Sequence, residues 1–194
     1  MSLFQPKLEN NFKIAIIGDG GVGKTAIRTK FLGKGFKATY METVGADFSS
    51  KTVFLDTIMN NIPITFQIWD LAGQPKFEKI RQMFYYGSQG LIFVFDLTRL
   101  DSLENIKLWV TEVLKNGIRD IPVLLIGNKS DLQEKGLVCC EPDDDIQLAK
   151  YIKKNLNDEK VSVHNIRTSA KTGYNIEEAF YILAREMYEM NSIT

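Results

Sequence analysis

The chain has 194 residues, of which 24 are basic and 24 are acidic, so its formal net charge is zero. This length most simply forms one domain with a sizeable core, and we expect a single domain over residues 1–194. The balanced charge excludes the strong field that favours nucleic acid or an acidic membrane surface, so we expect no nucleic-acid partner. No apolar run approaches the ~20 residues of a membrane-spanning helix.

The cysteines and the two ends of the chain indicate where in the cell the protein is expected. The two cysteines, Cys139 and Cys140, are adjacent. Adjacent residues seldom form a disulfide, so we expect reduced thiols and a cytoplasmic location. The N-terminus lacks the basic and apolar regions of a secretion signal, and Ser2 does not indicate N-myristoylation. The last residues, Glu189–Thr194, contain no cysteine for lipidation. We therefore expect no covalent membrane anchor, unless a longer chain continues beyond them.

The predicted elements alternate between strand and helix along the chain. Apolar or β-rich runs predict strands, in chain order, at residues 12–17, 48–58, 62–69, 91–96, 121–127 and 161–168. Helical spacing predicts helices at residues 24–32 and 101–116, and helices that begin at residues 142 and 175. Asp101 and Glu104 form a capping-box pair at the start of the second helix. Ile146 is expected on the buried face of the third, and Asn175, with Glu178 three residues on, is expected to cap the fourth.

The connections between these elements predict the topology of the sheet. A short turn at residues 59–61 joins the second and third strands and indicates an antiparallel hairpin. The other strands alternate with helices, which predicts right-handed crossovers and a sheet covered on both faces. We expect a three-layer α/β fold with a six-stranded, mostly parallel sheet in which one strand is antiparallel. Ligand loops should gather at the carboxyl ends of the strands.

The segment between the first strand and the first helix carries a phosphate-binding motif. Gly18–Thr25 reads GDGGVGKT, in which four residues separate a glycine from Gly-Lys-Thr. Glycines there let backbone N–H groups cradle phosphate oxygens, and the helix N-terminus points its positive end at the same anion. Lys24 can reach the outer phosphates, and the Thr25 hydroxyl suits a magnesium ion. The expected phosphate-binding residues of this loop are Gly20, Gly21, Val22, Gly23, Lys24 and Thr25.

A second motif, Asp70–Gln74, follows the third strand. A carboxylate at the end of a strand is well placed to hold magnesium, usually through water, and this role is expected of Asp70. Gly73, three residues on, permits close approach of its N–H to a terminal phosphate. An Asp-x-x-Gly turn is common by chance, so the motif gains weight only from its place at the sheet edge.

Two further segments indicate which base is bound. Asn128–Asp131 (NKSD) follows the fifth strand, and Ser169–Lys171 (SAK) follows the sixth. The carboxylate of Asp131 can accept two hydrogen bonds from N1–H and the 2-amino group of guanine, which adenine does not offer. A site built on such paired bonds rejects an analogue that lacks them by about 10⁴-fold or more. The expected guanine-binding residues here are Asn128, Lys129, Asp131, Ser169, Ala170 and Lys171.

Together these motifs resemble those of small GTPases of the Ras superfamily, over roughly residues 12–189. Thr43–Phe48 (TVGADF), Trp69–Gln74 (WDLAGQ) and the aromatic run Phe84–Tyr86 are most similar to the Rab branch. The resemblance implies a P-loop GTPase domain that binds GTP and GDP with Mg²⁺ and hydrolyses GTP to GDP and phosphate. An exchange factor, a GTPase-activating protein and effectors at the switch surface are the partners that it implies.

The resemblance also assigns roles to individual residues. Thr43 is expected to be the switch I threonine, which coordinates magnesium when the terminal phosphate is present. Gln74 is expected to orient the attacking water, so that the catalytic residues are Gln74, Lys24 and Thr43. Phe36 is expected to stack on the guanine, and Tyr40 to cover the phosphates. Phe48, Trp69 and Phe84 match an aromatic triad used for partner recognition, and simple hairpin packing is the alternative.

Hydrolysis is expected to be slow without a partner. No arginine lies between residues 36 and 43, and the nearest candidates, Arg28 and Arg81, lie on predicted helices. An arginine finger contributes about 10³–10⁵ in rate, so a partner would have to supply one. Gly20 leaves room for such a side chain.

Two alternatives stay open at this point. Pro75 follows Gln74 where the family usually has an acidic residue; it either restricts Gln74 or merely begins the next helix. A nucleotide-binding module without hydrolysis is therefore one alternative to the switch. A P-loop ATPase or kinase is the other, although Asn128–Asp131 argues against it.

Overall fold

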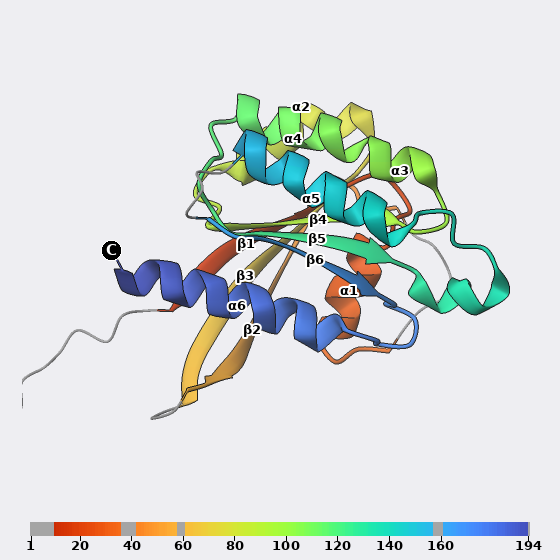
Figure 1. Cartoon of the computed structure of the whole chain (residues 1–194). Helices are drawn as coiled ribbons and strands as arrows, with labels where there is room; N and C mark the ends of the chain where they lie inside the picture. The colour runs from red at the N-terminus through yellow and green to blue at the C-terminus, as the bar shows by residue number, and fades with distance from the viewer. Residues whose placement is uncertain (1–9, 36–41, 58–60, 157–160, 194) are drawn as a thin grey trace, which may run out of the picture.

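The described residues of this computed structural model are 10–35, 42–57, 61–156 and 161–193, and they form a six-stranded sheet covered by helices (Figure 1). The strand order is β2-β3-β1-β4-β5-β6. β2 and β3 pair antiparallel, and the other neighbours pair parallel. The predicted three-layer α/β fold, with one antiparallel strand, is confirmed. The strands are β1 (Asn11–Ile17), β2 (Ala46–Asp56), β3 (Asn61–Leu71), β4 (Gly90–Asp96), β5 (Val123–Asn128) and β6 (Val163–Thr168).

The helices divide between the two faces of the sheet (Figure 1). One face is covered by α1 (Lys24–Phe31) and α6 (Ile176–Ile193). The other carries α2 (Glu78–Tyr85), α3 (Leu100–Glu104), α4 (Ile106–Lys115) and α5 (Pro142–Leu156). Two short 3₁₀ helices, η1 (Pro75–Phe77) and η2 (Ser130–Lys135), lie in the connections. Within the described part of the chain, no helix combines the length and the apolar character needed to cross a bilayer.

The helix expected at residues 101–116 is interrupted. It begins at Leu100 and breaks at Asn105, which separates α3 from α4. Asn105 Nδ2 donates to Asp19 Oδ2 at 2.8 Å, so a side chain at the break is tied to the loop after β1. The capping role expected of Asp101 is wrong, because Arg99 occupies the N-cap position and no side chain caps the helix.

Arg167 on β6 contacts the residues involved in two other differences from the predicted pattern. Ile146 on α5 is exposed, whereas Asp145 is buried. Asp145 Oδ2 accepts a hydrogen bond from Arg167 Nε at 2.6 Å, so an ion pair compensates the burial of this carboxylate. Asn175 immediately precedes α6, but its side-chain amide donates to the Arg167 carbonyl oxygen at 3.0 Å.

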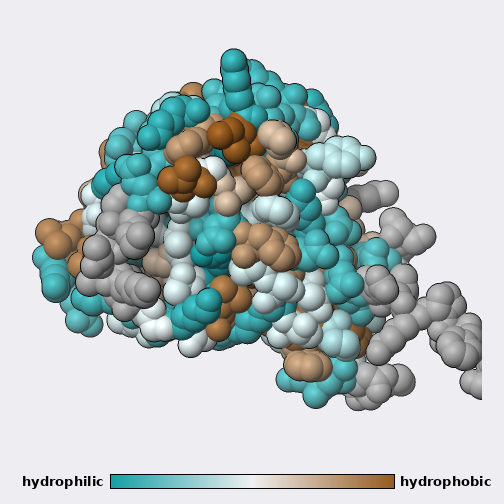
Figure 2. All heavy atoms as spheres, turned by 180° about the vertical axis from the view of Figure 1, so that it is seen from behind, coloured by the Kyte–Doolittle hydropathy of each residue, from teal (hydrophilic) through white to brown (hydrophobic). Residues whose placement is uncertain are grey.

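Apolar side chains gather in the upper part of the face turned away from the viewer in Figure 1 (Figure 2). The exposed large apolar side chains in and around β2 and α2 are Val44, Phe48, Phe54, Ile80, Met83 and Tyr86. Isolated exposed apolar residues are ordinary, but several on neighbouring elements often mark a contact surface.

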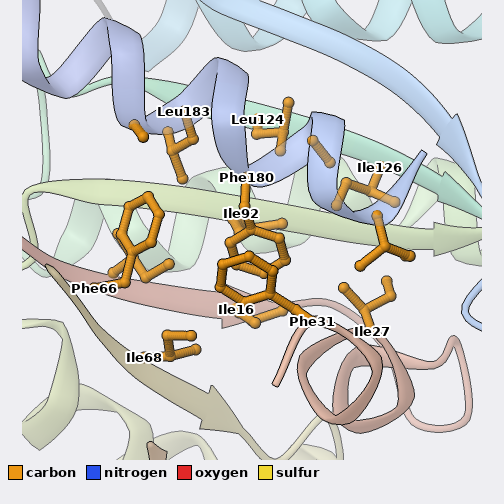
Figure 3. Close-up of a cluster of buried hydrophobic side chains, with 14 of the residues drawn as sticks. Ile16, Ile27, Phe31, Phe66, Ile68, Ile92, Leu124, Ile126, Phe180 and Leu183 are labelled. Carbon is orange, nitrogen blue, oxygen red and sulfur yellow. The ribbon is translucent and has the colours of Figure 1, made fainter. Parts of the chain in front are cut away.

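The core consists of two apolar clusters, one on each face of the sheet. β4 is buried along its whole length, as expected for a central parallel strand that is covered on both faces. Between the sheet, α1 and α6, the rings of Phe31 and Phe180 stack with centroids 3.6 Å apart and planes 4° apart (Figure 3). Phe66 meets both rings edge-on. These aromatic contacts hold α1, and therefore the loop before it, against α6.

We expect Phe180→Ala to lower the free energy of unfolding by roughly 3–5 kcal/mol, because it leaves a cavity in close-packed core and removes the stacked pair. Chemical denaturation followed by circular dichroism measures this change. Leu108→Ala, at an exposed position on α4, is the control and should stay within about 0.5 kcal/mol of the parent. A loss for Phe180→Ala as small as the control's would contradict this account of the core.

Candidate nucleotide site

The four predicted ligand segments leave the carboxyl ends of four strands. Gly18–Thr25 follows β1, Asp70–Gln74 ends β3, Asn128–Asp131 ends β5 and Ser169–Lys171 follows β6. Because β1 pairs with β3, and β5 with β6, the segments lie along one edge of the sheet. The order of strands thus places the phosphate motif beside the Asp70 motif, and the two base motifs beside each other.

The phosphate loop is held in a conformation that needs glycine. Gly18, Gly21 and Gly23 have φ angles of 139°, 78° and 103°. A Cβ at Gly18 would lie 2.1 Å from the Val94 carbonyl oxygen, and one at Gly23 would lie 2.2 Å from Asn128 Nδ2. Gly23 is also the N-cap residue of α1. Backbone amides of this loop and the helix N-terminus are therefore brought together, as an anion site requires.

Lys24 is buried within the loop that precedes it. Its Nζ donates to the carbonyl oxygens of Gly18 and Asp19, both at 2.7 Å. Burial lowers the pKa of Lys24 to about 8, and the nearby carboxylates of Asp70 and Asp19 oppose this decrease. The ammonium is thus fixed at the loop in an environment that lowers its pKa, so an anion beside it would raise the pKa again.

We expect nucleotide binding to take up a proton above about pH 8, because phosphate raises the pKa of Lys24 from about 8. Affinity should accordingly fall as the pH rises from about 8 toward 10, since the free protein then loses the proton that the complex keeps. The number of protons taken up per bound nucleotide is measured by calorimetry at pH 8.5, from the change in binding enthalpy between buffers of different ionisation enthalpy. Binding without proton uptake in any buffer would contradict the role of Lys24 as a phosphate-binding ammonium.

Three oxygen-bearing side chains meet where the loop approaches β3. Thr25 Oγ1 donates to Asp70 Oδ2 at 2.5 Å and lies 2.9 Å from Thr43 Oγ1. Burial raises the pKa of Asp70, which is fully buried. Among the described residues, none hydrogen-bonds to Asp70 Oδ1. A hard cation such as Mg²⁺ prefers oxygen ligands of this kind, so these three residues fit the ion.

Gly73 brings the second motif against the phosphate loop. A Cβ at Gly73 would lie 2.5 Å from the Gly18 carbonyl oxygen and 2.6 Å from the Gly20 nitrogen. Only glycine permits this approach. Gln74 follows at once, and no hydrogen bond reaches its buried Oε1 from the described residues. The amide oxygen predicted to orient a water is therefore buried, and no described residue donates a hydrogen bond to it.

Pro75 begins the 3₁₀ helix η1, as one of the two alternatives for this residue expects. Gln74 has φ −78° and ψ 141°, the extended conformation that a following proline favours. Whether Pro75 also restrains the side chain of Gln74 stays a hypothesis.

Asn128 joins the base motif to the phosphate loop and to the loop after β6. It is buried; its Nδ2 donates to the Val22 carbonyl oxygen at 2.9 Å, and its Oδ1 accepts from the Ala170 amide at 3.1 Å. Thr168 Oγ1 donates to the same Oδ1 at 3.3 Å. Asn128 therefore fixes three segments relative to one another.

The carboxylate expected to read guanine is held by its neighbours. Asp131 Oδ1 accepts from Ser169 Oγ at 2.6 Å, and Lys171 Nζ lies 4.0 Å from Asp131 Oδ2. Lys129 has a positive φ of 73°, which turns its side chain back toward the end of β4. The structure thus brings together the guanine-binding residues predicted at the ends of β5 and β6. Their roles stay predictions, and Phe36 and Tyr40 lie outside the described residues.

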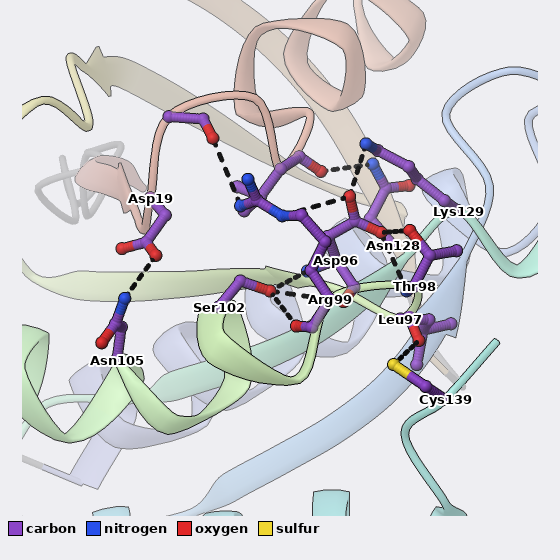
Figure 4. Close-up of polar contacts among 12 residues, drawn as sticks. Asp19, Asp96, Leu97, Thr98, Arg99, Ser102, Asn105, Asn128, Lys129 and Cys139 are labelled. Carbon is purple, nitrogen blue, oxygen red and sulfur yellow. Dashed lines mark hydrogen bonds and ion pairs between the residues drawn. The ribbon is translucent and has the colours of Figure 1, made fainter. Parts of the chain in front are cut away.

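The end of β4 carries side chains that the motif analysis missed (Figure 4). Asp96 is buried, and its Oδ2 accepts from Lys129 Nζ at 2.5 Å. Arg99 Nη2 donates to the Gly20 carbonyl oxygen at 3.3 Å. Asp19 accepts from Asn105 Nδ2 and from Trp109 Nε1, both at 2.8 Å. The rule that ligand loops follow strand ends, applied to β4, would have indicated Asp96.

The two arginines that the sequence offered as nearest candidates are engaged elsewhere. Arg81 is buried, and its guanidinium donates to Glu112 and to the carbonyl oxygens of Ala72 and Gln74 at 2.7–2.9 Å. Arg28 donates to Asp47 Oδ2 at 2.5 Å. These contacts fix the segment around Gly73 and the start of β2, and they pair each guanidinium with a carboxylate.

The three aromatic residues of the expected partner triad lie in contact. Phe48 and Trp69 have ring centroids 5.0 Å apart, and Trp69 and Phe84 have centroids 4.9 Å apart. Phe48 is half-exposed, whereas the other two are partly buried. The contacts are compatible with both alternatives, partner recognition and packing of the hairpin against α2.

Comparison with known proteins identifies the family to which this chain belongs. A family profile described as "Ras family" matches residues 13–189. Ras-related protein Rab-8B of Homo sapiens is 36% identical over 176 residues, which cover 91% of this chain and 78% of that protein. GTP-binding protein ypt1 of Schizosaccharomyces pombe is 34% identical over 184 residues, which cover 95% and 83%. Ras-related protein Rab-8 of Diplobatis ommata is 37% identical over 176 residues, which cover 91% and 77%.

These similarities decide among the three hypotheses that the motifs left open. A module without hydrolysis and an ATPase or kinase are both disfavoured by a match that spans nearly the whole sheet. This chain belongs to the Ras family, as a Rab-like small GTPase that binds and hydrolyses GTP and acts as a molecular switch.

Proposed function

We propose that this switch binds GTP and GDP together with Mg²⁺, and that the ion is held by Thr25, Thr43 and, through water, Asp70. The observation that carries the proposal is the meeting of these three side chains at 2.5 and 2.9 Å. Thr43 belongs to the segment before β2, whereas the other two belong to α1 and β3. No cluster of three His, Cys, Asp or Glu side chains that could hold a metal occurs in the described ranges. Phosphate oxygens and water would therefore complete the coordination of Mg²⁺, which suits this ion.

The residues around the loop then have distinct tasks in hydrolysis. Lys24 and the loop amides neutralise charge on the phosphates, and phosphoryl transfer depends chiefly on such positioning and neutralisation. Gln74 orients a water, whose oxygen bonds to the terminal phosphorus as the bond to the bridging oxygen breaks. The released phosphate carries the protons of the water, and GDP is the leaving group and stays bound. Mg²⁺, when bound, supplies further charge neutralisation. GTP orders the segments around Thr43 and Gly73, and hydrolysis releases them.

Partners of three kinds follow from this role: an exchange factor, an activating protein and effectors. Apolar side chains in and around β2 and α2 support a partner surface there, with the aromatic triad at its centre. Gly20, beside Gly73, leaves room for a residue from the activating protein. The free thiols of Cys139 and Cys140 support the cytoplasm as the compartment.

Gln74→Leu tests the hydrolytic part of the proposal. We expect its single-turnover hydrolysis rate to fall by about tenfold or more, because leucine cannot orient a water, while GDP affinity stays within about twofold. Gln82→Leu, at an exposed position on α2, is the matched control.

The magnesium part of the proposal is tested by chelation of Mg²⁺, which should speed GDP release from both variants. Unchanged hydrolysis in Gln74→Leu, or GDP release insensitive to chelation, would contradict the respective part.

A further inference from the structure

Arg99 lies at the rim of the phosphate loop, between Asp96 and Gly20 (Figure 4). Its Nη2 donates to the Gly20 carbonyl oxygen at 3.3 Å, and its Nε lies 3.7 Å from Asp96 Oδ2. The backbone that carries it is fixed, because the Arg99 carbonyl oxygen accepts from Ser102 Oγ at 2.7 Å. A fixed backbone and two long side-chain contacts leave the guanidinium positioned but weakly held.

The place of Gly20 puts this guanidinium near the outer end of the phosphate site. The Gly20 nitrogen would lie 2.6 Å from a Cβ at Gly73, the residue expected to approach the terminal phosphate. The positive charge of Arg99 is also felt at Lys24, whose pKa it helps to lower, after the larger effects of burial and of Arg81. Two cations therefore act on the same loop from different elements, one from α1 and one from the end of β4.

The side-chain hydrogen bond of Arg99 is longer than those of the other nearby arginines, and its side chain is more exposed than that of Arg28. Asp96 Oδ2 is shared with Lys129, which is much closer at 2.5 Å. Arg99 Nε is buried, and the described residues offer it no hydrogen-bond acceptor. The side chain as a whole is 38% exposed. Arg28 Nε also lacks an acceptor among the described residues, but the Arg28 side chain is only 9% exposed. Arg28 and Arg81 both donate to carboxylates at 2.5–2.8 Å.

We propose that Arg99 is a phosphate-contacting cation supplied by this chain itself, which strengthens GTP binding relative to GDP and speeds intrinsic hydrolysis. The inference rests on the proposed function and deepens it, because it locates at the phosphate loop an arginine, which the region between residues 36 and 43 lacks. A planar guanidinium can donate two parallel hydrogen bonds to phosphate oxygens. Arg99 now makes one long hydrogen bond, from Nη2 to the Gly20 carbonyl oxygen at 3.3 Å. Arginines supplied within the same chain are known to serve phosphoryl transfer in this way.

The test compares Arg99→Gln and Arg99→Lys with the parent protein and with Arg119→Gln, a control at an exposed position after α4. Three rates are measured: the dissociation rate of GDP, the dissociation rate of a non-hydrolysable GTP analogue, and the single-turnover hydrolysis rate. In Arg99→Gln we expect hydrolysis to fall by about tenfold or more, and the analogue to dissociate about threefold faster relative to GDP. Arg99→Lys should lie between Arg99→Gln and the parent, since it keeps the charge without the fork. The control should not change.

Each other outcome has a definite meaning. Hydrolysis and a dissociation ratio in Arg99→Gln within about twofold of the parent would overturn the inference. Equal losses in the Gln and Lys variants would also overturn it, because the charge would then have no role. A parent protein that binds GTP but releases no phosphate would instead refute the proposed hydrolysis. The dissociation ratio would still decide the role of Arg99 in that case.

Discussion

Asp131→Asn is expected to weaken GTP and GDP binding by about 10³–10⁴-fold and to confer binding of xanthine nucleotides. The carboxylate of Asp131 is positioned by Ser169 Oγ at 2.6 Å. Asparagine would place an NH₂ donor against the 2-amino donor of guanine, so one hydrogen bond would be lost and two donors would face each other. Xanthine carries a carbonyl oxygen at that carbon, which accepts from the new amide.

Competition between labelled GDP and unlabelled guanine or xanthine nucleotides measures this change. Asp101→Asn, at an exposed position on α3, is the matched control and should keep the guanine preference. If Asp131→Asn kept its affinity for GDP, the assignment of the base site to the ends of β5 and β6 would be wrong.

Lys24→Met is expected to weaken nucleotide binding by roughly 10²–10³-fold, since it removes a buried ammonium that would otherwise face phosphate oxygens. Methionine retains the length of the side chain but cannot donate to Gly18 and Asp19, which now accept at 2.7 Å. The measurement is the dissociation constant of GDP by equilibrium titration. Proton uptake on binding should disappear in the same variant.

Lys150→Met controls for the general loss of a positive charge, because Lys150 lies on the exposed side of α5. Its GDP affinity should equal that of the parent. A dissociation constant for Lys24→Met within about threefold of the parent would contradict the role of Lys24 in phosphate binding.

The parts of the site that depend on local chain geometry could be predicted from the sequence. Gly18–Thr25 and Asn128–Asp131 each place their functional groups through the conformation of a few successive residues. The alternation of strands and helices then predicted a shared sheet edge, and the strand order confirms it. Thr43 was identified by resemblance only, and its hydroxyl does meet Thr25 Oγ1 at 2.9 Å.

The parts that depend on contacts between distant residues could not be predicted. Asn105 breaks a helix whose apolar spacing continues through the break, and its side chain pairs with Asp19, 86 residues away in the chain. Asp96 holds Lys129 across two neighbouring strands, and no local motif indicates that pairing. Arg99 lies in no motif either, so the sequence alone suggested that the chain had no free arginine at its phosphate site.

The proposed role of Arg99 changes the expected source of positive charge at the phosphates during hydrolysis. Arg28 and Arg81 stabilise the segments around the loop through their carboxylate partners. Arg99 is the nearby arginine with long contacts and an exposed side chain. An activating partner would then add to a charge already present, and hydrolysis without a partner would be slow but measurable.

The measurement that tests the central claim most directly is the phosphate released per bound GTP in a single turnover with Mg²⁺ and no partner protein. The protein is loaded with GTP labelled at the terminal phosphate, and free nucleotide is removed before the reaction begins. The account predicts a slow, exponential release that approaches one phosphate per bound GTP and leaves GDP on the protein. GTP that stays intact while it stays bound would contradict it.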